Sequence, residues 1–242
     1  SVTVSGTEMS GGASAKATIA DADPVRVVTI GAAAQYLAAG AAGSWSLSLT
    51  ATQNGAAADG AAVGWTTGAT GFVLAPATGV TAANGTEGVV ASVEAIAGGG
   101  NSEVANVVTG CAWTSVCASW TVYGVAQPLW AIAVTSGGGQ SLVEGATPAV
   151  VSFQVTDGAG HALPGATVNV YQTAYAWEGA CGLRGACAAA PVLMTAQSTA
   201  VSDENGMVEV TPVEVAGVAQ VVRIAAATGT MGFVSTSVAV EP

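Results

Sequence analysis

Four cysteines are the residues of this chain whose spacing points most directly to chemistry. Cys111 pairs in sequence with Cys117 and Cys181 with Cys187, with five residues between the members of each pair. Spacing of five suits a structural zinc site poorly, and the single histidine, His161, cannot complete a ligand set for both pairs. The sequence therefore predicts two local disulfides, with pairing between the two halves of the chain as the alternative. Disulfides persist in oxidising compartments, so the predicted location is extracytoplasmic.

Residue patterns typical of enzymes do not accompany these cysteines. His161 falls in a turn rich in glycine, where a solvated side chain is favoured over a catalytic base. No serine stands in a Gly-x-Ser-x-Gly turn between a strand and a helix. The glycine runs at 98–100 and 137–139 lack the following helix that a phosphate-binding loop requires. The sequence predicts a protein that is not an enzyme and needs no cofactor.

Two acidic residues, Asp21 and Asp23, precede the first long region of alternating residues. Carboxylates at a boundary between domains can bind Ca²⁺, which takes about six to eight oxygen ligands. The corresponding later stretch, 125–128, contains no acid, so the feature does not recur. Solvated turn acids are the favoured interpretation, and a weak calcium site at Asp21 and Asp23 is the alternative.

Three aromatic residues lie beside the cysteines in a chain with only 5% aromatics. Trp113 lies between Cys111 and Cys117, and Tyr175 and Trp177 precede Cys181. Aromatic side chains on clipped loops can stack on sugar rings or anchor a protein partner. The alternative is that they fold back and cover an edge of the fold, which needs protection. Trp113, Tyr175 and Trp177 are thus the candidate ligand contacts.

The composition excludes several classes of protein. Fifteen Asp and Glu stand against four Lys and Arg, for a net charge of −11, so no basic surface is available for nucleic acid. Hydrophobic residues make up 51% and charged residues 8%, which excludes a disordered chain and a coiled coil. No apolar run reaches the roughly 18 residues that span a bilayer.

The sequence pattern of the elements that must position these residues occurs twice along the chain. Three landmarks recur in order: Pro24 and Pro128, Gly60 and Gly165, and Asn84 and Asn205. The offset is 104 positions at the first pair, 105 at the second and 121 at the third. The second copy therefore holds 16 extra residues between its second and third landmarks, and these contain Cys181 and Cys187. The first copy is longer after its third landmark, with 44 positions from Asn84 to Pro128 against 37 from Asn205 to Pro242, and this 7-residue surplus contains Cys111 and Cys117. Two homologous domains, 24–127 and 128–242, are predicted.

Within each copy the hydrophobic period is two. Trp45, Leu47 and Leu49 alternate with serines, and Val151, Phe153 and Val155 repeat the pattern. Such alternation predicts antiparallel strands with one buried face, separated by Asn-Gly and Asp-Gly turns. About seven short strands per copy favour an immunoglobulin-like sandwich. The predicted fold is all-β, with two tandem sandwiches in which Trp45 and Trp65 belong to the core.

Residues 1–23 contain a shorter alternating pattern, with Val2 and Val4 facing Ala15, Ala17 and Ile19 across a glycine-rich turn. We interpret this segment as a β-hairpin that closes a preceding repeat, because repeats tend to occur in runs. The alternative is a private N-terminal extension that donates a strand to another molecule.

At two stretches the second copy resembles the bacterial immunoglobulin-like domains of the intimin and invasin class. These are VTDGAGHALPGATV at 155–168 and SDENGMVEV at 202–210. The first copy departs from that pattern, because Gln53-Asn54-Gly55 replaces its Asp-x-x-Gly turn and no proline precedes Gly60. The resemblance implies an extracellular sandwich used in tandem as a stalk or adhesin, with no catalytic residues.

Taken together, these patterns predict a non-catalytic structural or adhesive segment of a bacterial cell-surface or secreted repeat protein. Expected partners are neighbouring immunoglobulin-like repeats or identical subunits, together with a glycan or protein on a cell surface. Two alternatives stay open. One is the protomer of an extracellular filament assembled by β-strand addition, and the other is a carbohydrate-binding module that uses the loop aromatics.

Overall fold

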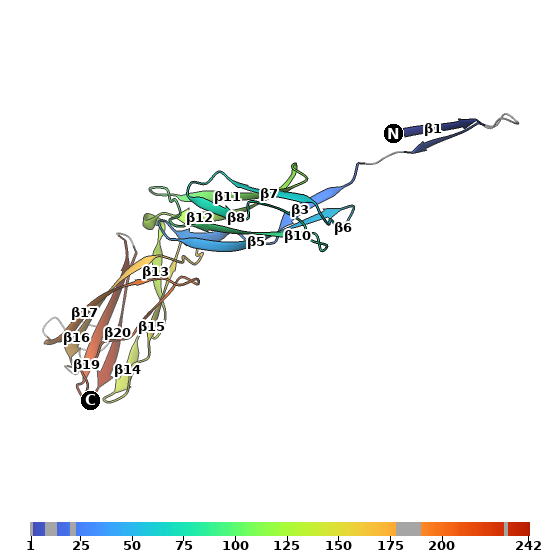
Figure 1. Cartoon of the computed structure of the whole chain (residues 1–242). Coiled ribbons are helices and arrows are strands. Elements are labelled where there is room, and N and C mark those ends of the chain that lie inside the picture. The colour runs from blue at the N-terminus through green and yellow to red at the C-terminus, as the bar shows by residue number, and fades with distance from the viewer. Residues whose placement is uncertain (1, 8–13, 20–22, 178–189, 230–231) are drawn as a thin grey trace.

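A computed structural model describes residues 2–7, 14–19, 23–177, 190–229 and 232–242. Every long element in these ranges is a β-strand, and the one helical element among them is a single 3₁₀ turn, η1 (Gln127–Leu129). Figure 1 shows two strand-rich bodies that meet near η1. The all-β, immunoglobulin-like fold class predicted from the sequence is confirmed.

The first body, here called the first sandwich, contains two sheets. One has the order β3 (Arg26–Ile30), β5 (Gly43–Gln53), β10 (Thr86–Val93), β8 (Phe72–Ala75), with β6 (Ala56–Ala57) paired to β5. The other has the order β4 (Gln35–Ala38), β12 (Val116–Val125), β11 (Glu103–Ala112), β7 (Ala62–Thr67), β9 (Thr78–Val80). The chain changes sheets between β3 and β4, and β4 then runs parallel to β12.

The second sandwich has the same plan with two changes. Its first sheet has the order β13 (Ala131–Ser136), β15 (Val151–Thr156), β18 (Met207–Val210). Its second has the order β14 (Gln140–Val143), β20 (Gly232–Glu241), β19 (Gln220–Thr228), β16 (Thr167–Ala176), β17 (Val192–Val201). Among the described residues no fourth strand lies beside β18, where the first sandwich has β8, and the long β17 replaces the three-residue β9.

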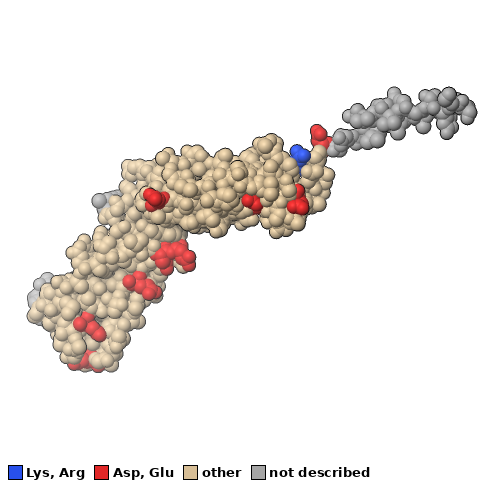
Figure 2. Space-filling view, in the orientation of Figure 1, with Lys and Arg blue, Asp and Glu red and all other residues tan. Residues whose placement is uncertain are grey.

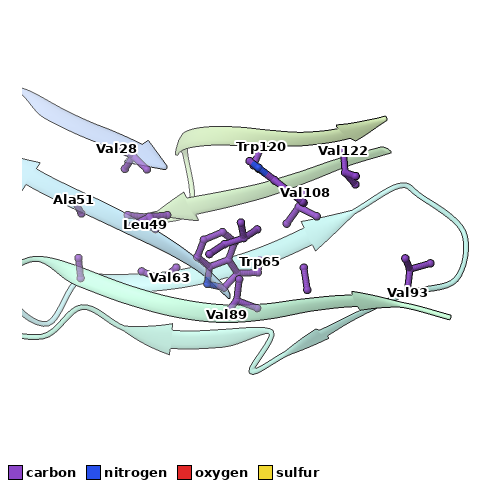
Figure 3. Close-up of a cluster of buried hydrophobic side chains, with 14 of the residues drawn as sticks. Val28, Leu49, Ala51, Val63, Trp65, Val89, Val93, Val108, Trp120 and Val122 are labelled. Atoms are coloured by element: carbon purple, nitrogen blue, oxygen red, sulfur yellow. The ribbon is translucent and has the colours of Figure 1, made fainter. Parts of the chain in front are cut away.

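The alternating residues of the strands build a separate core in each sandwich. In β5, Leu47, Leu49 and Ala51 are buried between exposed or half-buried neighbours. Figure 3 shows Leu49, Trp65 and other labelled side chains pointing into the space between strands of the first sandwich. In the second, Phe153 and its alternating valines fill the equivalent layer. Burying one face of each strand supplies the main driving force for these layers.

A buried hydroxyl recurs at the same place in both sandwiches. Thr81 Oγ1 accepts a hydrogen bond from the Ala61 N–H at 2.9 Å, and Ser202 Oγ accepts one from the Ala166 N–H at 2.9 Å. The two donors are 105 positions apart and the two acceptors 121, which are the offsets of the sequence repeat. Each hydrogen bond joins the residue just before one strand, β7 or β16, to the residue just after its neighbour, β9 or β17. The domain limits 24–127 and 128–242 themselves stay a prediction.

The N-terminal segment contains β1 (Val2–Thr7) and β2 (Ser14–Ile19), which pair antiparallel from Val2 opposite Ile19 to Thr7 opposite Ser14. Neither strand pairs with any other strand that the structure describes. That this hairpin closes a preceding repeat, or donates a strand, stays a prediction.

Candidate functional site

The first predicted disulfide site lies at the tip of the β11–β12 hairpin. Cys111 and Cys117 are cross-strand partners with 4.0 Å between their Cα atoms, and a disulfide joins them. Trp113 and Thr114 both have positive φ, at 51° and 68°, so the chain reverses in a tight turn between the cysteines. The disulfide therefore clips the hairpin immediately below its turn. Cys181 and Cys187 lie outside the described residues.

Trp113 sits on this clipped turn and leans back onto the first sandwich. Its ring packs against the first core, and the guanidinium carbon of Arg26 lies 5.0 Å from the ring centroid. Stacking of this kind is a cation–π contact, which holds a surface ring in place. The ring is thereby fixed by β3, an element distant in sequence. Ligand contact through Trp113 stays a prediction.

Tyr175 lies near the end of β16 and Trp177 just after it in the second sandwich, so both belong to a different body from Trp113. Arg223 of β19 lies 5.6 Å above the Tyr175 ring. The backbone N–H of Trp177 donates to the Ala219 carbonyl at 3.0 Å, and Trp177 is half-buried. The Tyr175 ring and the Trp177 backbone are thus each held by a neighbouring segment of the second sandwich. Their proposed role in ligand binding is likewise a prediction.

His161, expected in a solvated turn, has a more specific environment. Its ring stacks face to face on Tyr36 of β4, with 3.8 Å between ring centroids and 7° between ring planes. Its Nδ1 lies 2.7 Å from Oδ2 of Asp157. Because Tyr36 belongs to the first sandwich, the loop between β15 and β16 docks the second sandwich against it. A single sequence cannot reveal such a contact, since 125 positions separate the two rings.

Asp157 anchors this loop from within. Its side chain is buried, and Oδ1 accepts hydrogen bonds from the N–H groups of Ala159 at 2.9 Å and His161 at 2.8 Å. Burial pushes the pKa of Asp157 upward, but the side-chain and backbone hydrogen bonds from His161 and Ala159 outweigh it and hold the pKa below its ordinary value. The carboxylate is therefore ionised near neutral pH and fixes the position of the imidazole.

Further contacts complete what we call the junction, the meeting of β4 and β12 with the 157–165 loop and η1. The Ala38 N–H donates to the Pro164 carbonyl at 3.0 Å, which is a backbone hydrogen bond between the sandwiches. Trp130, just after η1, is buried and its indole Nε1–H donates to the Val125 carbonyl at 2.9 Å. The junction thus combines backbone pairing, a buried indole and a ring stack.

Tyr36 lies between two rings at the junction, because Tyr123 of β12 stacks on it with 5.1 Å between centroids. Partial burial, followed by the negative charge of Glu103, raises the pKa of Tyr36. The Tyr36 hydroxyl is consequently protonated across the neutral range.

Charged groups are sparse over the described surface. Figure 2 shows a largely uncharged face with small, separate groups of acidic residues. Among the residues that the structure describes, no three His, Cys, Asp or Glu side chains gather as metal ligands would. Asp23 is exposed and Asp21 lies outside the described residues, so weak calcium binding there stays a prediction. In the described part of the chain, no helix has the length and apolar character needed to cross a membrane.

Comparisons with known proteins extend the description of the fold. No protein family and no curated protein matches the sequence. The D0–D1 domain of intimin is similar over 90% of this chain and 100% of that chain, with 16% identity and a TM-score of 0.35. The Yersinia pseudotuberculosis adhesin InvE is similar over 89% of this chain and 58% of that chain, with 13% identity and a TM-score of 0.35. A chimeric titin Z1Z2 is similar over 89% of this chain and 96% of that chain, with 10% identity and a TM-score of 0.41. The similar structures thus include parts of bacterial adhesins.

Proposed function

We propose that this chain is a non-catalytic structural segment of a bacterial cell-surface or secreted protein, in which successive sandwiches stack into a stalk that carries adhesion. The junction is the observation that supports this most directly. A connection between domains that must only tether them needs no backbone hydrogen bond, buried indole or ring stack. Here the connection from Val125 to Trp130 is short and each of these contacts is present.

The clipped hairpin and the low charge support the same proposal. The Cys111–Cys117 disulfide suits an oxidising exterior. With only four Lys and Arg, the chain offers few sites to proteases that cleave after basic residues. The resemblance of 155–168 and 202–210 to the intimin and invasin pattern points to the same class of protein.

Small-angle X-ray scattering of the full chain tests the stalk. We expect one elongated form whose maximum dimension is unchanged between low and high salt, because the junction contacts are mostly apolar or backbone-mediated. A matched control inserts a flexible Gly-Ser segment after Gln127, which should shorten the average dimension and broaden its distribution. If the unmodified chain already behaves like the control, the sandwiches are merely tethered and the stalk proposal is wrong.

A second candidate function, a filament protomer assembled by strand addition, is favoured by one observation. The β1–β2 hairpin pairs with no other described strand, and an isolated two-stranded hairpin is marginally stable in water. Addition of this hairpin to the sheet of the next copy would complete it and would generate open chains. Long oligomers that disappear when residues 1–22 are deleted would support this function over the stalk.

A further inference from the structure

The outer edge of β17 is unlike every other sheet edge in the described part of the two sandwiches. The strand is ten residues long and pairs only with β16 among the described strands. Its side chains are exposed on both faces, with Val201 64%, Val192 55% and Met194 39% exposed. A row of unpaired N–H and C=O groups along such a strand is a template for another strand.

The remaining edges of the sandwiches are short, and several are blunted. β9 has three residues, and the four-residue β8 ends immediately before Pro76. β13 changes register between Val134 and Ser136, which interrupts its short ladder. β17 also changes register, between Val192 and Met194, but its ladder is regular from Met194 to Val201. Shortness, proline and bulges are the devices by which proteins stop edge-to-edge pairing.

The edge at β18 is short, and the chain that follows it is fixed by a proline and a side chain. This four-residue strand is followed by Pro212, two positions after its end. The Gln172 side chain of β16 donates to the Thr211 carbonyl at 3.1 Å and accepts from the Val213 N–H at 2.9 Å. Two backbone groups just beyond the end of β18 are therefore already bonded. β17, with the sequence VLMTAQSTAV, contains no proline, glycine or charged residue.

We propose that the β17 edge is a self-association surface, on which a second copy of this chain adds its own β17 antiparallel. Charge favours this occupant. Two copies with net charge −11 repel each other, so they can meet closely only where neither presents an acid. β16 and β17 together contain no charged residue, which makes their edge such a surface.

The strand is also compatible with itself in sequence. A two-fold axis through Ala196, within the regular part of the strand, places Met194 of one copy opposite Ser198 of the second copy. Met194 lies on the same face as the partly buried Ala200, the face toward the second core, yet it is exposed because the opposing sheet has only three strands. Val192 lies beyond a register shift, pairs with Tyr175 and is exposed on the other face. The second copy would cover Met194 and join two five-stranded sheets into one.

Antiparallel pairing makes the two chains run in opposite directions. On the proposed stalk, this is the arrangement of two molecules that extend from facing surfaces. The arrangement between facing surfaces rests on the proposed function, whereas the self-association of β17 does not.

A charge-swap experiment tests the surface. Gln197 is exposed near the centre of β17 and lies close to its own copy across the two-fold axis. In sedimentation velocity across the micromolar range, we expect the unmodified chain to associate with rising concentration. Gln197→Lys alone and Gln197→Glu alone should each weaken association by at least about tenfold, because like charges meet in the pair. An equal mixture of the two variants should restore it.

Val90→Lys is the matched control, since Val90 is exposed on β10 but its backbone pairs with strands on both sides. This variant should associate like the unmodified chain. The proposal is overturned by a chain that stays monomeric, by association that Gln197→Lys leaves unchanged, or by association that is lost only when residues 1–22 are deleted. Scattering of the monomeric Gln197→Lys variant still tests the stalk, so the two proposals fail separately.

Discussion

At the scale of single residues, buried polar groups of this protein range from fully satisfied to unpartnered. The Gln220 side chain, almost completely buried, bonds the backbone of Val215 through both its oxygen and its nitrogen. The Thr228 hydroxyl at the end of β19 is buried and has no hydrogen-bond partner among the described residues. An unpaired buried hydroxyl costs free energy, because it loses its bonds to water and gains none in return.

Thr228→Val is therefore expected to stabilise the protein. The substitution exchanges the unpartnered hydroxyl for a methyl group of similar size, and the free energy of unfolding should rise by about 1 kcal/mol. Urea denaturation followed by tryptophan fluorescence measures the change. Thr81→Val serves as the contrast, since that hydroxyl bonds Ala61 and Ala58, and its loss should destabilise.

Asp157 makes stability depend on pH in the acidic range. Its pKa in the folded state is lowered, so its contribution is complete above the ordinary aspartate pKa of about 3.9 and is lost as pH falls through the folded value. We expect the unmodified chain to lose stability below about pH 4. Asp157→Asn should be less stable at neutral pH and should lack this part of the pH dependence, as measured by thermal unfolding at a series of pH values. Identical profiles for the two proteins would contradict this role of Asp157.

At the scale of elements, each strand ladder combines local turns with distant constraints. The β11–β12 hairpin pairs ten residues on each side and bears its disulfide next to the turn. Its other edge is held by β7, whose Trp65 reaches the first core. The disulfide thus reinforces a hairpin that already has a partner strand.

Replacing Cys111 and Cys117 together by serine should lower stability without changing the fold. Closing so short a loop restricts the unfolded chain, and the expected loss is about 2 kcal/mol in free energy of unfolding. Chemical denaturation measures the loss, and circular dichroism checks that the strands persist. A loss of β-signal in the double variant would show that the hairpin needs the disulfide to form.

At the scale of the whole molecule, the junction decides how the sandwiches are joined. Gly165 has a φ of 77° and faces the first sandwich, where an added Cβ would collide with the Cβ of Ala41. Gly160, in the same loop, has a φ of 94°, but a Cβ there would meet nothing within 4 Å. The loop thus contains a matched pair of glycines, of which only Gly165 lies against the first sandwich.

Gly165→Ala should therefore open the junction, whereas Gly160→Ala should not. Each substitution costs roughly 1 kcal/mol because alanine disfavours positive φ. Only the first should also change the scattering profile of the full chain and expose Trp130 to a fluorescence quencher. Equal scattering changes in both variants would assign the effect to the loop itself instead of its contact with Ala41.

The sequence by itself determined the strands, the turns between them and the repeat. Alternation at Leu47, Leu49 and Phe153 is a local signal, because a strand places successive side chains on opposite faces whatever its neighbours are. The same reasoning missed β17. Its residues do not alternate between buried and exposed, because most of them are exposed, and the 16-residue surplus predicts a clipped loop in this region of the chain.

Only the tertiary structure decided how the two copies meet and which edge stays open. The stack of Tyr36 on His161 joins residues whose distance along the chain exceeds a whole repeat, so no spacing in the sequence could indicate it. The exposed edge of β17 exists because the segment after β16 joins one sheet and leaves the other with three strands. Strand identity follows from local periodicity, whereas docking and edge exposure depend on which distant surfaces come together when the sandwiches close.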